Sequence, residues 1–135
     1  MKKILLLFAI PILLLSCDDS SKDLNMKVIN LSVKSNDWVE NLDQNGLNRY
    51  YSCHFTMPEI TSSVYQNGNA STYIVFNNSQ QILPYVRHYE NAAGALWTRT
   101  VDFDYSKGGM NIYVTNSDFV VDPPEAMDFR VAIVW

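Results

Sequence analysis

Two aspartates in the segment VDFDY could do chemistry as a pair. Asp102 and Asp104 alternate with apolar and aromatic residues over 101–105, and on a β-strand this alternation sends both carboxylates to one face. Side chains two residues apart lie roughly 6.5–7 Å from each other, given a rise of about 3.3 Å per residue. That spacing suits glycoside hydrolysis, or a calcium site completed by Asp118 or Asp122. The simpler interpretation is a solvated strand face, and we favour it because it explains the alternation without further assumptions.

The segment LPYVRHYE carries a second candidate, a possible binding surface. Tyr85, Arg87 and Tyr89 share one face of the predicted strand, whereas His88 and Glu90 share the other. Tyrosine rings with an arginine between them suit a glycan or protein partner. The same residues could instead form a cross-strand stack that stabilises the sheet. We favour this structural interpretation and keep the binding surface as the alternative.

Motifs for other chemistries are missing from the sequence. It contains no Gly-rich phosphate loop, no G-x-S-x-G, no H-E-x-x-H and no cysteine pair with zinc spacing. The two histidines, His54 and His88, fall on separate predicted strands, and a zinc site would need a third ligand as well. We therefore predict no catalytic residue, no metal and no cofactor.

The residue with the best defined chemistry is Cys17. A positively charged start at residues 1–3 precedes an apolar run of 12 residues at 4–15, the layout of a secretory signal peptide. A membrane-spanning helix would need about 20 apolar residues. The run ends in Leu-Leu-Ser-Cys, which resembles the lipobox of bacterial lipoproteins. That resemblance implies cleavage between Ser16 and Cys17, a diacylglyceryl group on the Cys17 thiol and a fatty acid such as palmitate on its amine.

These signals divide the chain into a signal peptide at 1–16, a lipidated tether at 17–25 and a single β domain at 26–135. Removal of the signal peptide leaves 119 residues, the size of one domain, with a net charge of about −6 because two lysines leave with it. An acidic domain is a poor nucleic-acid binder. It is also repelled by anionic headgroups, so the lipid would hold it at the membrane. Lipidation of Cys17 leaves Cys53 as a lone thiol, which we expect to be buried.

Period-two alternation recurs along the domain, and helical periodicity is almost absent. Over 49–57 the alternation places one apolar set on one face: Tyr51, Cys53, Phe55 and Met57. We expect further strands at 26–33 and 128–135, a helical turn at 61–68 closed by Gly68, and a hairpin of 95–106 with 109–116. About seven short strands favour an antiparallel, immunoglobulin-like β-sandwich, with a small barrel as the alternative.

The segment 71–89 predicts another hairpin, turning at Asn77-Asn78-Ser79. Both faces of its first arm are apolar over 73–76, which predicts a central strand buried on two sides. Pro84 in the second arm predicts an edge strand or a bulge, because proline cannot donate a ladder hydrogen bond.

The sequence also resembles the small lipoproteins of uncharacterised function found in Bacteroidetes. The resemblance rests on the segments LLLSCDD, NDWVE, SVYQNG, LPYVRHYE, LWTRTVDFDYS, YVTNSDF and AMDFRVAIVW, which together span most of the chain. It implies a lipidated β domain facing the cell envelope, and it carries no catalytic residues to transfer. The acidic residues after Cys17 resemble a surface-export signal of that phylum, which implies attachment to the outer membrane with the domain on its outer face.

Three functions follow from these observations. The leading one is a non-enzymatic, membrane-anchored lipoprotein that binds a glycan or protein partner. The second is a small glycan-acting hydrolase that uses Asp102 and Asp104. The third is a structural or assembly subunit that pairs with its neighbours through an exposed edge strand.

Overall fold

A computed structural model describes residues 24–135, so Ser16, Cys17 and the signal peptide lie outside the described residues. The described part consists of short strands with one 3₁₀-helix (η1) and one α-helix. In chain order these are β1 (Met26–Val33), η1 (Ser35–Asp37), β2 (Val39–Leu42), β3 (Arg49–Thr56), α1 (Ser62–Asn67), β4 (Asn69–Phe76), β5 (Ser79–Ile82), β6 (Tyr85–Glu90), β7 (Leu96–Ser106), β8 (Gly109–Asn116) and β9 (Met127–Val134).

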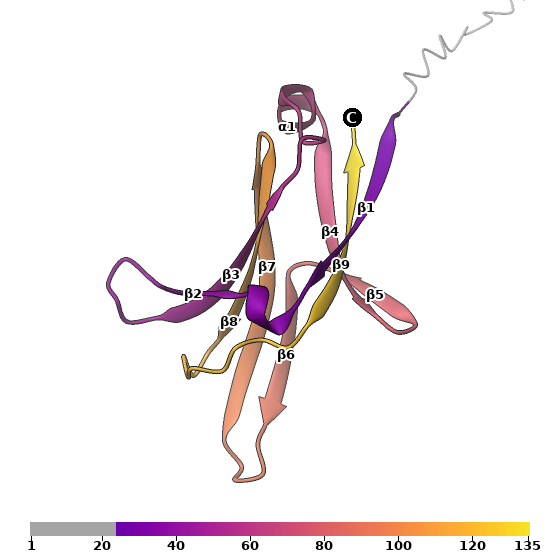
Figure 1. Ribbon diagram of the computed structural model, residues 1–135. Coiled ribbons are helices and arrows are strands. Elements are labelled where there is room, and N and C mark those ends of the chain that lie inside the picture. The colour runs from indigo at the N-terminus through magenta and orange to yellow at the C-terminus, as the bar shows by residue number, and fades with distance from the viewer. Residues whose placement is uncertain (1–23) are drawn as a thin grey trace, which may run out of the picture.

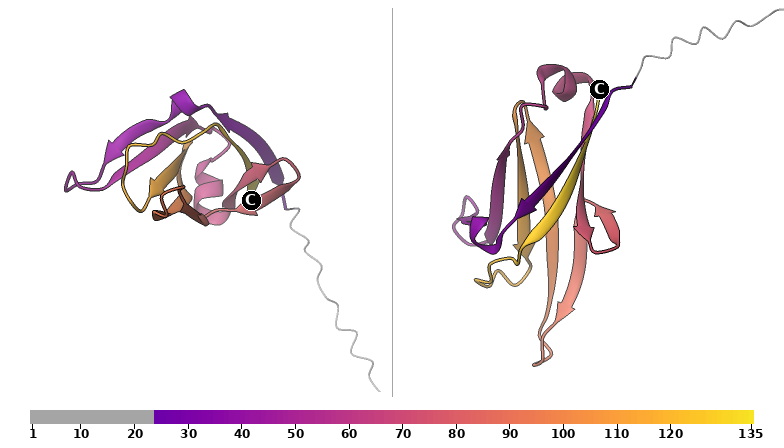
Figure 2. Two further views of the ribbon diagram at one scale, coloured as in Figure 1. Left: turned by 90° about the horizontal axis from the view of Figure 1, so that it is seen from below. Right: turned by 45° about the vertical axis from the view of Figure 1, so that its right-hand side comes forward.

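The strands form two separate antiparallel sheets that face each other (Figures 1 and 2). One sheet has the order β1-β9-β4-β5 and the other has the order β2-β3-β8-β7-β6. The antiparallel β-sandwich predicted from the sequence is therefore confirmed, and the small barrel is not what forms. The sandwich contains nine strands rather than about seven, because the short strands β2 and β5 carry no alternation long enough to be recognised.

The register places the chain entry and the last residues at the same end of the sandwich. Met26 pairs with Val134 and Asn69 also pairs with Val134, so β1, β9 and β4 are aligned there. Asn25 and Trp135 exchange two backbone hydrogen bonds of 3.1 Å, which extends this pairing into the predicted tether. Helix α1 lies at that end as well (Figure 1).

Local turn chemistry is confirmed where it was predicted. Phe76 pairs with Ser79 across Asn77-Asn78, and β7 and β8 join through a turn at Gly108, whose φ is +80°. Glycine adopts such a φ without a Cβ penalty. Helix α1 ends at Gly68 as expected, since the Gly68 amide donates to the Val64 carbonyl. At the start of the helix the Thr61 hydroxyl accepts a bond from the Val64 amide, a cap that was not predicted.

Two expectations for 71–89 need correction. The second arm of the predicted hairpin is two strands, because the chain leaves one sheet after β5 and enters the other at β6, with a cis peptide bond between Leu83 and Pro84. Residues 73–76 are central in their sheet but buried on one side only, since Ile74 is buried whereas Tyr73 and Val75 are half-buried. Nothing among the described residues packs over their outer face as a third layer would.

The core fills the space between the inward faces of the two sheets. Its fully buried side chains alternate along the central strands, including Ile112 and Val114 of β8 and Phe129 and Val131 of β9. Burial of each such side chain contributes roughly 1.5–3 kcal/mol. On β3 the predicted inward set is confirmed in orientation, although Cys53 and Phe55 are half-buried rather than fully buried.

Candidate functional site

The predicted cluster on β6 faces the interior of the sandwich rather than its outer surface. Tyr85 is buried, Tyr89 is half-buried and Arg87 is exposed at the edge of the sheet. The Arg87 guanidinium lies 5.4 Å from the centre of the Tyr85 ring. The three residues therefore share one face as predicted, and they differ in how much of each side chain reaches solvent.

Strand β7 completes this cluster with residues that pair directly with β6. Trp97 pairs with Tyr89, and their rings stack with centres 5.4 Å apart and planes 14° from parallel. Arg99 pairs with Arg87 and places its guanidinium 5.5 Å from the centre of the Tyr89 ring. The cross-strand stack that we considered for β6 is thus present, and its second half comes from β7.

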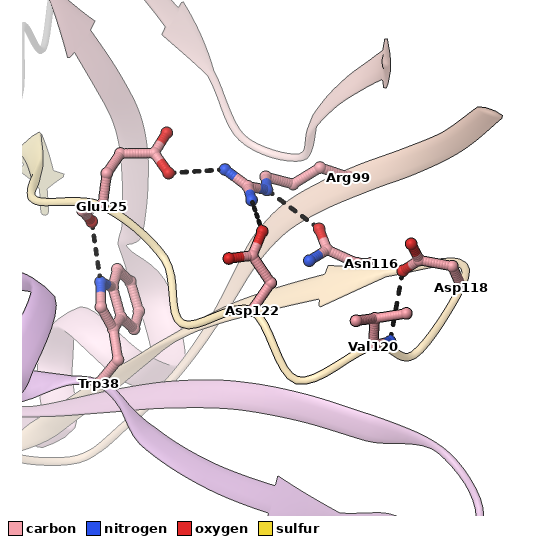
Figure 3. A network of polar contacts seen from close by, with 7 residues as sticks. All are labelled: Trp38, Arg99, Asn116, Asp118, Val120, Asp122 and Glu125. Carbon is pink, nitrogen blue, oxygen red and sulfur yellow. Dashed lines mark hydrogen bonds and ion pairs between the residues drawn. The ribbon is translucent and has the colours of Figure 1, made fainter. Parts of the chain in front are cut away.

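Arg99 is the central polar residue of this region, and the sequence interpretation missed it. It is 7% exposed, although it carries a charge that costs several kcal/mol to bury without a partner. Its Nε donates to Oδ1 of Asn116 at 3.0 Å and its Nη1 donates to Oε2 of Glu125 at 2.7 Å. An Asp122 carboxylate oxygen lies 3.8 Å from Nη2. Figure 3 shows the guanidinium surrounded by these three acceptors.

A signal in the sequence could have revealed Arg99. It has the same parity along β7 as Trp97, Val101 and Phe103, so alternation alone places it on the core-facing side. An arginine at an inward position requires acceptors from elsewhere in the fold.

Asn116 is the last residue of β8, and the two carboxylates come from the segment between β8 and β9, residues 117–126. Arg99 binds this segment from one side, and the indole nitrogen of Trp38 donates to the Glu125 carbonyl at 3.1 Å from the other (Figure 3). Within the segment, Phe119 has a φ of +54° and its amide donates to the Asn116 carbonyl at 3.0 Å. Arg99 and Trp38 thereby position the segment across one end of the sandwich.

A cavity of about 600 Å³ lies beside Arg99, between the two sheets. Its size is typical of a small-molecule site. Three parts of the fold line it. They are the end of β4 and the turn after it (74–77), the β6 and β7 residues Tyr85, Tyr89, Arg99 and Val101, and the residues before and at the start of β9 (125–128).

The chemistry of this cavity combines aromatic rings with hydrogen-bonding groups. Phe76 packs against Tyr85 with ring centres 5.6 Å apart. Burial raises the pKa of Tyr89, and the neighbouring Tyr85 raises it further, so the Tyr89 hydroxyl is protonated at neutral pH. Arg99 and the carboxylates of Glu125 and Asp128 contribute charges of both signs. The site therefore offers apolar faces, hydroxyl donors and carboxylate acceptors within one cavity.

The predicted aspartate pair lies elsewhere, on the outer face of the five-stranded sheet. The two oxygens of Asp104 accept bonds of 2.8 Å from the Asn111 amide and the Tyr113 hydroxyl. Burial, followed by the bond to Asp104, raises the pKa of Tyr113 to about 12. Burial and the Asp104 charge also raise the pKa of Asp102. Both aspartates share a face as predicted, and the structure places them outside the cavity.

The histidines and the free thiol also lie away from the cavity. His54 and His88 are exposed, with their Nδ1 atoms 2.8 Å from the Asn111 amide oxygen and 2.9 Å from the Thr98 hydroxyl. Within residues 24–135, no group of three or more His, Cys, Asp or Glu side chains is arranged to hold a metal. Burial, with the charge of Asp37, raises the pKa of the Cys53 thiol.

No protein-family model, curated protein or solved structure matches this chain significantly. The site is therefore interpreted from its own geometry. Over the described residues, the helices are all too short or too polar to span a bilayer.

Proposed function

We propose that this protein is a non-enzymatic, lipid-anchored binding module of the bacterial cell envelope. Its ligand would be a small, uncharged, hydroxyl-rich molecule such as a saccharide, held in the cavity between β4, β6 and β7. The observation that carries the ligand proposal is that cavity, where exposed parts of aromatic rings lie beside a buried arginine whose charge is already matched.

The charges around the cavity favour a neutral ligand. The Arg99 guanidinium is bound by Glu125 and approached by Asp122, and Asp128 adds a further carboxylate to the lining. An anionic ligand would have to displace Glu125 from Arg99 and approach Asp128. Both steps cost electrostatic energy.

The aromatic residues favour a ligand with an apolar face and polar edges. Phe76, Tyr85 and Tyr89 supply ring surface, and tyrosine combines an apolar body with a hydroxyl that needs a partner. Saccharides present C–H faces to rings and hydroxyls to carboxylates. A cavity of about 600 Å³ has room for one or two sugar rings, within the range of roughly 300–1,000 Å³ for small-ligand sites.

Binding can be tested with the full-length lipidated protein in detergent micelles. Neutral, anionic and cationic mono- and disaccharides are offered as probes, and saturation-transfer NMR reports binding. We expect the neutral probes to give signals with the wild type, and we expect Tyr89→Ala to abolish these signals. The matched control is Tyr50→Ala, which removes a half-buried tyrosine from the outer face of β3 and leaves the signals intact.

Three results would contradict the ligand proposal. They are binding by none of the probes at millimolar concentration, stronger binding of the anionic probes, and neutral-probe signals that survive Tyr89→Ala.

The anchor proposal rests on the resemblance of the segment before Cys17 to a lipobox. Two or more acyl chains hold a protein stably at a bilayer. Labelled palmitate should enter the wild type and the Cys53→Ala control but not Cys17→Ala. Equal labelling of all three would refute the anchor.

The proposed location is the outer membrane, with the domain on the outer face of the cell. It is supported by the acidic residues after Cys17, which resemble a surface-export signal. Protease treatment of intact cells should degrade the domain, and full protection would reverse the choice of face.

A further inference from the structure

We propose that the domain docks on the bilayer through the end at which its chain enters, so that the cavity faces away from the membrane. The docking surface, here called the tether-end patch, consists of Leu24, Met26, Tyr65 and Trp135. The inference rests on the proposed lipidation of Cys17 and adds an orientation that the anchor alone does not supply.

The tether-end patch is exposed and apolar. The fractional exposures of Leu24, Met26, Tyr65 and Trp135 are 76%, 68%, 56% and 41%. Tryptophan and tyrosine are the residues that concentrate at membrane–water interfaces, because their rings are apolar and their edges are polar. Exposed apolar side chains also occur at the opposite end, for example Leu42, Leu47 and Leu96. The attachment of the tether is therefore what distinguishes the tether-end patch as the surface that meets the bilayer.

The four residues lie at the same end of the sandwich, where the Tyr65 ring packs against Tyr105 of β7 with ring centres 6.3 Å apart. Leu24 and Met26 flank Asn25, which exchanges backbone hydrogen bonds with Trp135. Tyr65 belongs to α1, and a Cβ added at Gly68, just after α1, would lie 3.1 Å from the Trp135 Cβ. Figure 1 shows α1, the start of β1 and the end of β9 at the same end of the sandwich.

The covalent chain keeps this end near the lipid. Seven residue steps separate Cys17 from Leu24, and a fully extended chain spans at most about 3.6 Å per residue, or roughly 25 Å in total. The tether end is therefore the part of the domain that reaches the bilayer first.

The distribution of charge favours the same orientation. At the tether end, Lys27 forms an ion pair of 2.9 Å with Glu59. The β7–β8 turn, which carries Lys107, lies beside the segment that leads into α1, since the Gly108 amide donates a hydrogen bond to the Ile60 carbonyl. Acidic residues outnumber basic ones towards the opposite end: Asp37, Glu40, Asp43, Asp118, Asp122 and Glu125 lie there together with Lys34, Arg49, Arg87 and Arg99. Anionic headgroups repel that acidic end.

The cavity lies at the acidic end of the sandwich. Its β4 residues, 74–77, lie at the opposite end of that strand from Asn69, which pairs at the tether end. Its residues 125–128 precede or begin β9, whose last residues pair with Met26. Docking through the tether-end patch thus presents the cavity to the space beyond the membrane, where a soluble saccharide would arrive.

The tryptophans allow a direct test, because Trp135 belongs to the patch. Trp38 follows η1, beyond the end of β1, and Trp97 lies at the start of β7, at the other end of that strand from the β7–β8 turn. The full-length lipidated protein is reconstituted into phosphatidylcholine vesicles that contain a lipid with a nitroxide on its headgroup. We expect strong quenching of tryptophan fluorescence in the wild type and in Trp97→Phe. We expect several-fold weaker quenching in Trp135→Phe.

A second pair of variants tests the apolar contacts without changing a fluorophore. Met26→Ser should reduce the quenching of Trp135. The control Val39→Ser replaces another exposed apolar residue, 59% exposed on β2, and should leave quenching unchanged. Circular dichroism of each variant shows that the fold is retained.

Vesicle flotation separates the two proposals. Protein that floats with the vesicles but whose quenching is unaffected by Trp135→Phe would overturn the docking and leave the anchor standing. Protein that does not float would overturn both, because the docking depends on the lipid.

Discussion

Replacement of Arg99 by methionine tests how far the buried polar network around this residue stabilises the domain. Methionine keeps most of the aliphatic volume and removes the charge and all the guanidinium donors. The affected partners differ in burial: Asn116 is 7% exposed, whereas the side chains of Glu125 and Asp122 are 66% and 64% exposed. The cost should therefore come mainly from Asn116 rather than from the ion pairs.

The magnitude follows from these contacts. The side-chain oxygen Oδ1 of Asn116 loses its donor inside the protein, which costs about 1–3 kcal/mol. Loss of the guanidinium over the Tyr89 ring adds about 0.5–1 kcal/mol. The freed carboxylates return to water at little cost, as is usual for exposed pairs. We expect the free energy of unfolding to fall by roughly 1.5–4 kcal/mol, which corresponds to a decrease in Tm on the order of 10 °C for a domain of this size.

The matched control is Arg87→Met on the neighbouring strand. Arg87 is directly opposite Arg99 and also lies over a tyrosine, but it is exposed and makes no hydrogen bond or ion pair within the described residues. Its replacement should change the free energy of unfolding by less than about 1 kcal/mol. Urea titration followed by circular dichroism measures both variants. Equal destabilisation by the two substitutions would refute the role given to the buried network.

Further predictions concern three other places in the fold. Tyr51 is buried, and its hydroxyl has no hydrogen-bond partner among residues 24–135. Tyr51→Phe should therefore leave the free energy of unfolding unchanged or raise it by up to about 1 kcal/mol. A clear loss of stability in urea titration would show that the hydroxyl does have a partner. The pKa of Asp102 is raised in the folded state, so its ionisation destabilises the fold as pH rises above the ordinary value of 3.8. Asp102→Asn should then raise the urea midpoint at pH 7, with a gain that vanishes below that value. Asp104→Asn, which replaces one of the two acceptor oxygens with an amide donor, should lower the midpoint. The reverse order would contradict the assignment. A Cβ at Gly68 would overlap the Val134 carbonyl oxygen. Gly68→Ala should therefore lower the free energy of unfolding by about 2 kcal/mol or more. A thermal melt that matches the wild type would show that this contact is not tight.

Features of the fold that depend on neighbouring residues were predictable. The first strand was predicted with the boundaries that β1 has, and the turns at Asn77-Asn78 and before Gly109 were located from their residue types. The capped turn at α1 was predicted from Gly68. Each of these signals lies within a few residues of the structure that it specifies, so no knowledge of packing is needed.

Features that depend on distant residues were not predictable. The change of sheet between β5 and β6 reflects which partner each arm finds, and alternation does not specify a partner. The four-residue strand β2 is defined by its pairing with β3, in which Val39 is opposite Ser52. The same limit applies to the site, because Tyr85 and Tyr89 share one strand whereas Arg99 lies on the paired strand β7 and its carboxylate partners come from the β8–β9 segment.

The sequence by itself determined which side chains share a strand face, since that depends only on the two-residue period of extended backbone. It thereby grouped Tyr85 with Tyr89 and Asp102 with Asp104 correctly. The alternation already favoured a solvated face for Asp102 and Asp104. Only the tertiary structure decided that Tyr85 and Tyr89 face inward, because the face that is buried depends on the sheet packed against it. The tertiary structure alone also brought the segment 117–126 across the end of the sandwich, where Arg99 needs counter-charges that local sequence does not supply.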